Sequence, residues 1–339
     1  MPLCKMRRGS NQRGTGHSPL PGRSRQRLAR PVIGRFACVG LALCGAGIGP
    51  NQVAAAGFDL DFFKPTTPST GTFCEENGLT VAPGRLDLGA SGGYAYRPLV
   101  LGNQANSAVV GDVVRERVTT FLAASYGITD NIDFGFRLAA VARQVGTVDA
   151  DIATNAGVPQ HPRSAALGDL DLIARVGLLR VNRAHKRFRL TLLAPLAIPT
   201  GATDALASNG RVSFRPRLIA GWHWDRTAAA VSAGYGYTAA TEVSSSALVV
   251  GKAVVAGLAF SYAVVPGRVW IQAEASFNMG IDLSATGRGT AATQVMTGPR
   301  VLIPGGIVLQ AGVGTGLMRS AGSPRLSGVF SVARVWDFR

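Results

Sequence analysis

The 339-residue sequence is short of charge: Asp, Glu, Lys and Arg make up only 16% of it, against about 25% in an ordinary soluble domain. Long stretches with helical periodicity are also lacking, so helices are not expected to dominate the fold. Apolar residues reach 47%, which excludes a disordered chain. Gly is abundant, with 43 residues, while aromatic residues amount to 7%. This composition favours a sheet protein that presents little charged surface.

Acidic residues are absent from residues 1–56, which hold nine basic residues. A 13-residue apolar run, Phe36–Ile48, follows the basic stretch, and VAAAG comes next at Val53–Gly57. A basic region, a short apolar run and small residues at a cleavage site are typical of a secretory signal peptide. We therefore predict that residues 1–56 are a cleaved leader. Much of the net charge of +16 lies there, and no basic helix comes after it, so nucleic-acid binding is not expected.

Cysteine and histidine are scarce, with four of each. Removal of the leader would leave Cys74 as a single cysteine without a candidate base beside it, so neither a disulfide nor a cysteine nucleophile is expected. His161, His185 and His223 have no second histidine or carboxylate at metal-ligand spacing. An outer-membrane hydrolase would need Ser or Asp paired with His223 across the sheet, but the pattern favours a solvated interfacial histidine. We predict no catalytic residue, no metal, no cofactor and no enzymatic activity.

Residues 57–84 differ from the rest of the predicted mature chain, because Pro and Thr interrupt them and alternation is weak. They are interpreted as a periplasmic extension or a short plug. From residue 85 onward, polar and apolar residues alternate over short stretches, most clearly in Ile132–Val145. The same alternation recurs over 168–179, 212–224 and 269–278. Side chains alternate faces along a strand, so each stretch has one apolar and one partly polar face. Alternation alone does not say which face points inward, so a soluble sandwich stays open on this pattern.

Tight connections near 127–131, 182–186, 225–226, 265–268 and 304–306 alternate with longer ones near 97–111, 146–166, 200–211, 239–248, 279–289 and 318–325. Short periplasmic turns and long outer loops are typical of outer-membrane barrels. Aromatic residues near the predicted strand ends fit the interfacial girdles of such barrels. We therefore predict an all-β fold: an up-and-down antiparallel transmembrane β-barrel of about twelve strands over residues 85–339, with both termini periplasmic.

Several phrases together carry a family resemblance. They are FDLDFFKPTT (58–67), RPLVL (97–101), ERVTTFLAASYGITDNIDFGF (116–136), LGDLDLIARVGLL (167–179), LLAPLAIPTG (192–201) and FRPRL (214–218). In order and spacing this set resembles the N-terminal barrel of OmpA-family outer-membrane proteins from myxobacteria and their relatives, and more broadly outer-membrane transporter barrels. The resemblance implies location in the outer membrane of a Gram-negative cell. The sequence ends where the barrel ends, so the peptidoglycan-binding domain of many members is not expected.

The polar strand faces supply candidate pore-lining residues: Arg117, Arg137, Arg143, Arg175, Arg189, Arg215, Arg217, Asp133, Asp169, Asp171 and Glu274. One account pairs these charges across strands, because an unpaired buried charge is costly. The other account is an aqueous pore whose arginine excess favours anions. We expect a passive pore or small-solute transporter, whose partners are the lipid bilayer, the outer-membrane assembly machinery and small solutes. The alternative is a non-conducting structural or adhesive barrel that acts through its outer loops.

Overall fold

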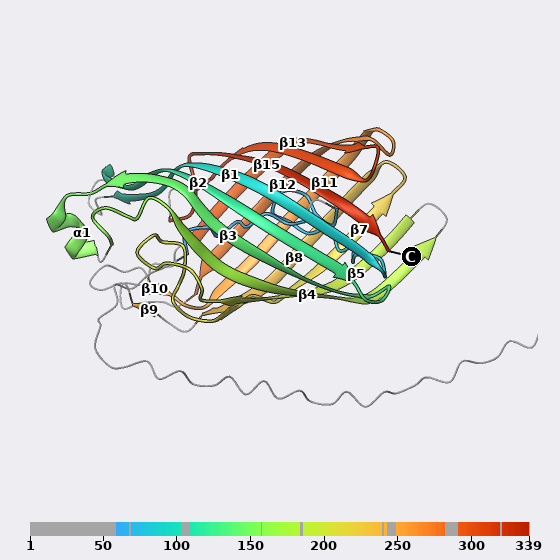
Figure 1. Cartoon of the computed structure of the whole chain (residues 1–339), viewed down its shortest axis with the longest axis horizontal. Helices are drawn as coiled ribbons and strands as arrows, with labels where there is room; N and C mark the ends of the chain where they lie inside the picture. Colours follow the sequence, from blue (N-terminus) through green and yellow to red (C-terminus); the bar gives the residue numbers. More distant parts are fainter. Residues whose placement is uncertain are drawn as a thin grey trace, which may run out of the picture. The chain divides into compact units, whose positions relative to one another are not determined.

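The fold is a closed antiparallel β-barrel (Figure 1). The computed structural model describes residues 59–338 apart from 68, 103–108, 157, 184–185, 239–240, 243–248, 282–290 and 319–320. The predicted signal peptide lies outside these residues. The main sheet holds 13 strand segments, of which β6 and β7 are two pieces of one strand, so the barrel has 12 strands. The sheet closes because β1 pairs with both β2 and β15. The predicted architecture is therefore confirmed.

The barrel strands are β1 (Arg85–Gly102), β2 (Val109–Gly127), β3 (Ile132–Thr147), β4 (Ala166–Arg183), β5 (Lys186–Ile198), β6 (Ser213–Phe214), β7 (Arg217–Trp224), β8 (Thr227–Thr238), β11 (Ala253–Val265), β12 (Val269–Gly280), β13 (Ala291–Ile303), β14 (Ile307–Thr315) and β15 (Leu326–Asp337). A small hairpin of β9 (Thr241–Glu242) and β10 (Val249–Val250) lies in the β8–β11 connection. One short helix, α1 (Ala150–Ala156), lies between β3 and β4. Among the described residues, no helix is long and apolar enough to cross a membrane.

The connections alternate in length as expected. Those after β2, β4, β7, β11 and β13 are tight, and those after β1, β3, β5, β8, β12 and β14 are long. Because neighbouring strands are antiparallel, all tight turns lie at one end of the barrel and all long connections at the other. Short turns face the periplasm in outer-membrane barrels. We call the two ends the periplasmic end and the outer end accordingly.

The faces of the sheet settle the question that alternation left open. Bulky apolar side chains such as Leu122, Phe134 and Leu258 are exposed, at 52–56%. Charged side chains on the opposite face, including Asp133 and Arg175, are buried at 0–1%. A soluble sandwich would show the reverse, because its charged side chains face water and its bulky apolar side chains fill the core. An apolar outer surface around a polar interior places this barrel in a membrane, and its closed antiparallel form is that of the outer membrane.

Residues 59–84, called here the inner segment, cross the interior of the barrel (Figure 1). The segment starts against the β5–β6 connection at the outer end, where the Asp59 N–H donates to Asn209 Oδ1 and the Leu60 N–H donates to the Leu206 carbonyl. At its end, the Gly84 N–H donates to the Gly127 carbonyl at the periplasmic end. The two ends of the barrel itself, Arg85 of β1 and Asp337 of β15, pair with each other at the periplasmic end, as expected. The described residues begin at the outer end, because the inner segment runs the length of the barrel before β1 starts.

An apolar cluster covers the interior at the outer end. It brings Leu60 of the inner segment together with Leu99, Val113, Val114, Val148, Ala153 and Leu206. These residues come from β1, β2, α1 and the long connections around them. Burial of such side chains stabilises the folded outer end by about 25 cal/mol for each Å² of apolar surface removed from water.

Candidate lumen site

The structure brings most of the predicted pore-lining residues to the inward face of the barrel. Arg117, Asp133, Asp169, Asp171, Arg175 and Glu274 are buried there. Arg137, Arg189, Arg215 and Arg217 are partly buried. These side chains surround the inner segment, so their environment is protein rather than an open aqueous channel.

Arg143 does not share this face. β3 contains a bulge, since Val118 of β2 pairs with Arg143 whereas Thr119 pairs with Val141, which leaves Ala142 unpaired in this ladder. One extra residue shifts the alternation of side chains by one position. Arg143 is consequently exposed, and Gln144 takes the inward place, where it accepts a hydrogen bond from Arg117 at 2.7 Å. The assignment of Arg143 to the lumen lining is thus wrong.

Four of the predicted lumen residues form two charge pairs across neighbouring strands. Asp133 on β3 lies directly opposite Arg175 on β4, and Arg137 on β3 lies opposite Asp171 on β4. The closest nitrogen–oxygen distances are 2.9 Å and 2.7 Å, respectively. Directly opposed side chains in an antiparallel sheet are close enough to interact, so the strand register itself sets these pairs.

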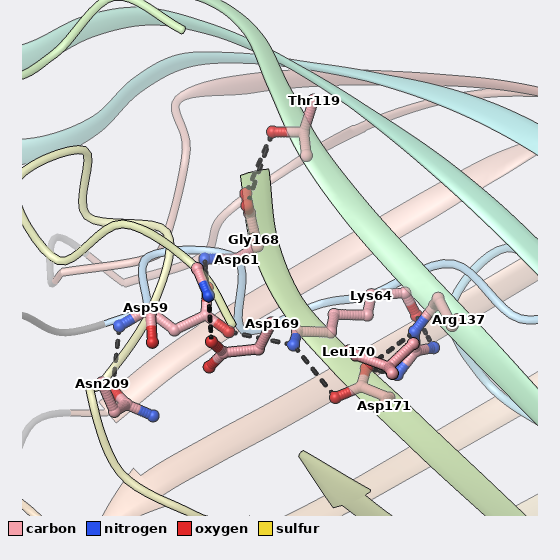
Figure 2. Close-up of polar contacts among 12 residues, drawn as sticks. Asp59, Asp61, Lys64, Thr119, Arg137, Gly168, Asp169, Leu170, Asp171 and Asn209 are labelled. Carbon is pink, nitrogen blue, oxygen red and sulfur yellow. Dashed lines mark hydrogen bonds and ion pairs between the residues drawn. The ribbon is translucent and has the colours of Figure 1, made fainter. Parts of the chain in front are cut away.

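The inner segment supplies the remaining partners. Asp61 binds Arg117 at 2.6 Å, Glu76 binds Arg175 at 2.7 Å, and Glu75 lies 3.4 Å from Arg217. Lys64 contacts Asp59 at 3.0 Å and Asp171 at 3.4 Å, and Figure 2 shows it reaching between them beside Arg137. These wall charges, which would be costly to bury alone, are each offset by an opposite charge on the segment.

Glu274 holds the middle of the inner segment through hydrogen bonds. Its carboxylate accepts the N–H groups of Phe73, Cys74 and Glu75 at 2.9–3.1 Å, and the hydroxyl of Thr72 at 2.6 Å. A carboxylate that accepts several backbone N–H groups forms strong, charge-assisted bonds. Glu274 therefore fixes a turn of the segment against β12. Nearer the periplasmic end, the Val81 N–H donates to Asp133 at 2.8 Å.

Glycines on the wall make room for the segment. A Cβ atom added at Gly221 would lie 2.2 Å from the Asn77 carbonyl oxygen, and one added at Gly312 would lie 2.7 Å from the Phe73 ring. A Cβ atom added at Gly257 would lie 2.1 Å from the carboxylate carbon of Glu75. Glycine in a strand often marks a close approach, and here three separate strands are approached by one backbone carbonyl and two side chains of the inner segment. The inner segment is therefore fitted to the wall in shape as well as in charge.

Burial changes the proton affinity of groups on the inner segment. Burial alone would lower the pKa of Lys64, but Asp59 and Asp171 outweigh it and hold that pKa above its ordinary value. Burial raises the pKa of Glu75, although Arg217 and two serine hydroxyls oppose the change. Burial also raises the pKa of the Cys74 thiol well above its usual range, with Glu274 and Glu75 adding to the effect. Because the thiolate is the reactive form, Cys74 is unreactive where it lies.

A small cavity remains between the inner segment and the wall formed by β3, β4, β5 and the broken β6–β7 strand. Its volume is about 30 Å³, and its lining includes the side chains of Phe62, Lys64, Arg137, Asp171, Pro195, Ala197, Ser213, Arg215 and Arg217. Four of these side chains are cationic and one is acidic. The break between β6 and β7, at Arg215 and Pro216, places the two arginines of this strand on the cavity.

The candidate histidines have no catalytic partners among the residues that the structure describes. His161 is exposed in the β3–β4 connection, and His185 lies outside the described residues. His223 Nε2 lies 3.1 Å from the Asn77 carbonyl oxygen, so His223 is another contact of the inner segment. Within the described parts of the chain, no group of three His, Cys, Asp or Glu residues is placed to hold a metal ion.

The residues that sequence reasoning missed are those of the inner segment itself. Asp59, Asp61, Glu75 and Glu76 are four of the 19 acidic residues of the chain, and they lie within a short stretch. That local excess of acid, in a chain with an excess of arginine on its strands, was the signal available. It indicates charge complementarity, but it does not indicate which arginine each acid binds.

Comparisons with known proteins show the fold. No family model matches the chain, and no curated protein sequence matches it. An outer-membrane channel from Pseudomonas putida F1 is similar in structure, with a TM-score of 0.58 and 16% identity over 77% of this chain and 98% of that one. The NanC porin matches with a TM-score of 0.43 and 8% identity over 74% of this chain and 100% of that one.

The translocator domain of the autotransporter NalP from Neisseria meningitidis matches with a TM-score of 0.39 and 13% identity, over 75% of this chain and 89% of that one. The scores of NanC and NalP reflect a loose correspondence, so of these three the Pseudomonas channel defines the shared architecture. The chain is an outer-membrane β-barrel, and it is similar in fold to this channel. The narrower resemblance to the OmpA family stays a prediction.

Proposed function

We propose that this protein is a passive outer-membrane pore or small-solute transporter that prefers anions, with the inner segment as its plug. The observation that carries the proposal is the polar interior. Replacing buried ion pairs by well-packed apolar residues is often neutral or stabilising, so stability alone does not require a charged interior. A lumen that becomes hydrated when the plug shifts does require a charged interior.

The contacts of the plug support a segment that can move. Its ties to the wall are mainly ion pairs and hydrogen bonds, made by Asp61, Lys64, Glu75 and Glu76 and by the backbone at residues 73–75. Water can replace such contacts at modest net free energy, because the groups exchange one set of hydrogen bonds for another. Displacement of the plug would leave arginines on the wall without their acidic partners, and a lumen rich in arginine favours anions.

A non-conducting structural or adhesive barrel is the second candidate. The observation that favours it is the apolar cluster of Leu60, Leu99, Val113, Val148 and Leu206 at the outer end, because apolar burial resists hydration. We further propose that the protein has no enzymatic role, that it is inserted by the outer-membrane assembly machinery, and that it is a distant relative of OmpA-family barrels.

Single-channel recording in planar bilayers tests the proposal, with the plug free or locked. Val329 belongs to the same buried apolar cluster as Cys74, so Val329→Cys offers a partner for a disulfide in a background whose other three cysteines are serine. We expect steady current steps with anion selectivity in the reduced protein, loss of the steps on oxidation and their return with reductant. Steps that oxidation leaves unchanged would contradict the plug. Silence in every state, with heat-modifiable gel mobility showing a folded barrel, would favour the structural candidate.

A further inference from the structure

Arg215 has hydrogen-bonding capacity that the protein does not use. It lines the cavity beside Lys64 and Arg137, yet its guanidinium forms no ion pair and no side-chain hydrogen bond with any residue that the structure describes. Its neighbour Arg217 approaches Glu75 through Nη1 at 3.4 Å, whereas its Nε is buried and has no hydrogen-bond partner within the same described part of the chain.

The other charges of the cavity are already committed. Asp171 accepts hydrogen bonds from Arg137 and Lys64, and Lys64 also binds Asp59. The cluster of described residues holds four cations, on Lys64, Arg137, Arg215 and Arg217, and four carboxylates, on Asp59, Asp169, Asp171 and Glu75. Lys64, Arg137 and Arg217 each form an ion pair with one of these carboxylates, whereas Arg215 forms none with a described residue.

The neighbouring strand β8 is shaped to hold the two arginines. A Cβ atom added at Gly234 of β8 would lie 2.6 Å from Cγ of Arg217, and one added at Gly236 would lie 3.4 Å from Cγ of Arg215. The arginine stems thus lie against glycines, which keeps the guanidinium groups close to the wall. Two fork-shaped guanidiniums beside one small space match the planar oxygens of a carboxylate.

We propose that this cavity is a binding subsite for the carboxylate group of a small organic acid, held by Arg215 with Arg217 beside it. The volume of about 30 Å³ takes about two water molecules, which is the space that a carboxylate group occupies. Only Arg215 among the four cations lacks an ion pair with a described residue, which matches a monoanion better than a phosphate dianion. Phe62, Pro195 and Ala197 line the same cavity and accept the apolar carbon next to the carboxylate. The proposal deepens the proposed function by naming a solute class, and it rests on that function only for passage of the solute.

Acetate binding to the full-length folded protein in detergent tests the subsite apart from conduction. Isothermal titration calorimetry with acetate, at constant ionic strength set with chloride, is compared for the wild type and for Arg215→Gln. We expect saturable binding that Arg215→Gln weakens at least about tenfold, because charge-assisted hydrogen bonds are lost. Arg143→Gln is the matched control, since Arg143 is exposed outside the cavity, and it is expected to bind acetate as the wild type does.

A second variant keeps every charge and removes the space. Ala197→Val adds two methyl groups to a buried residue of the lining and is expected to weaken acetate binding without changing net charge. Equal acetate affinity in the wild type, Arg215→Gln and Ala197→Val would overturn the subsite, and so would tighter binding of phosphate than of acetate. Acetate binding in a protein that gives no current would retain the subsite and overturn the pore. Current in a protein that does not bind acetate would retain the pore and overturn the subsite.

Discussion

Asp133 on β3 lies directly opposite Arg175 on β4, and the two side chains form an ion pair of 2.9 Å that is closed to solvent. The same guanidinium binds Glu76 of the inner segment at 2.7 Å. One arginine therefore links two strands of the wall to the segment that crosses the interior. Its removal would leave two carboxylates buried without this cation.

Arg175→Met is accordingly expected to lower the free energy of unfolding by about 3–5 kcal/mol, the usual cost of removing one partner from a buried ion pair. Urea unfolding of the folded barrel, followed by heat-modifiable gel mobility, measures the change. Arg143→Met is the control and is expected to stay within about 0.5 kcal/mol of the wild type, because Arg143 is exposed. Equal stability of the two variants would show that the three-residue cluster does not hold the inner segment.

The hydrogen bonds to Glu274 predict a second effect. Glu274→Ala removes the acceptor for the N–H groups of Phe73, Cys74 and Glu75, so the segment is expected to leave the wall more often. The rate at which a maleimide labels Cys74 in the folded protein reports this release. We expect labelling about tenfold faster or more in Glu274→Ala than in the wild type, since several charge-assisted bonds are lost. Glu274→Gln keeps one acceptor oxygen and is expected to fall between the two, and a rate in Glu274→Ala no faster than in the wild type would refute the anchoring role.

The glycine contacts predict a third effect. Gly221→Ala places a Cβ atom 2.2 Å from the backbone oxygen of Asn77, and backbone cannot rotate away as a side chain can. The segment or the strand must therefore shift, and Cys74 is expected to react with maleimide faster than in the wild type. Gly92→Ala is the matched control on β1, because an added Cβ there meets nothing within 4 Å. Equal labelling rates in the two variants would mean that the wall yields instead of the segment.

Much of the barrel could be predicted from the sequence. Alternation and turn spacing are local properties, and stretches such as Ile132–Val145 carry them without help from the rest of the chain. The course of residues 59–84 could not be predicted, because the contacts that hold them to the wall, such as Asp61 with Arg117, join positions far apart in the sequence. Local patterns give the face of a strand, but not what fills the space behind it.

The lumen lining shows the same limit at the scale of single residues. The alternation of side chains along β3 assigns Asp133 and Arg137 to the inward face correctly. It fails at Arg143, because the bulge at Ala142 lies between Arg137 and Arg143. A bulge depends on the pairing of two strands, and no residue type marks this one in the sequence. The break at Arg215 and Pro216 is better signalled, since proline cannot donate to a sheet, yet its effect on the cavity depends on the inner segment.

The orientation of the barrel gives a fourth prediction. Asp151 in α1 lies at the outer end and Arg268 in the β11–β12 turn at the periplasmic end, and both are exposed. A membrane-impermeant maleimide is therefore expected to label Asp151→Cys on intact cells and to label Arg268→Cys only after the outer membrane is permeabilised. Both single cysteines are placed in a background that lacks the native ones. Labelling of Arg268→Cys on intact cells would reverse the assignment of the two ends.

Protonation of Glu75 gives a fifth prediction, in which burial and the ion pair with Arg217 shift the pKa of Glu75 in opposite directions. Burial raises the pKa of Glu75, while Arg217, Ser276 and Ser232 lower it, and the neighbouring Glu76 raises it further. Glu274 of β12 faces the same stretch of the inner segment, and its carboxylate disfavours a second negative charge there. The net direction is upward, so the folded protein binds this proton more tightly than the unfolded chain does.

A raised pKa in the folded state contributes stability that is fully present below the ordinary pKa of a glutamate and is lost as pH rises through the raised value. Glu75→Gln removes this contribution at every pH. The free energy of unfolding of the wild type, minus that of Glu75→Gln, is therefore expected to fall as pH rises from about 4 to 8. Urea unfolding of both proteins across this range measures the difference, in which groups common to both cancel. A difference that rises with pH would mean that the ion pair with Arg217 outweighs burial, and that Glu75 stays charged in the closed lumen.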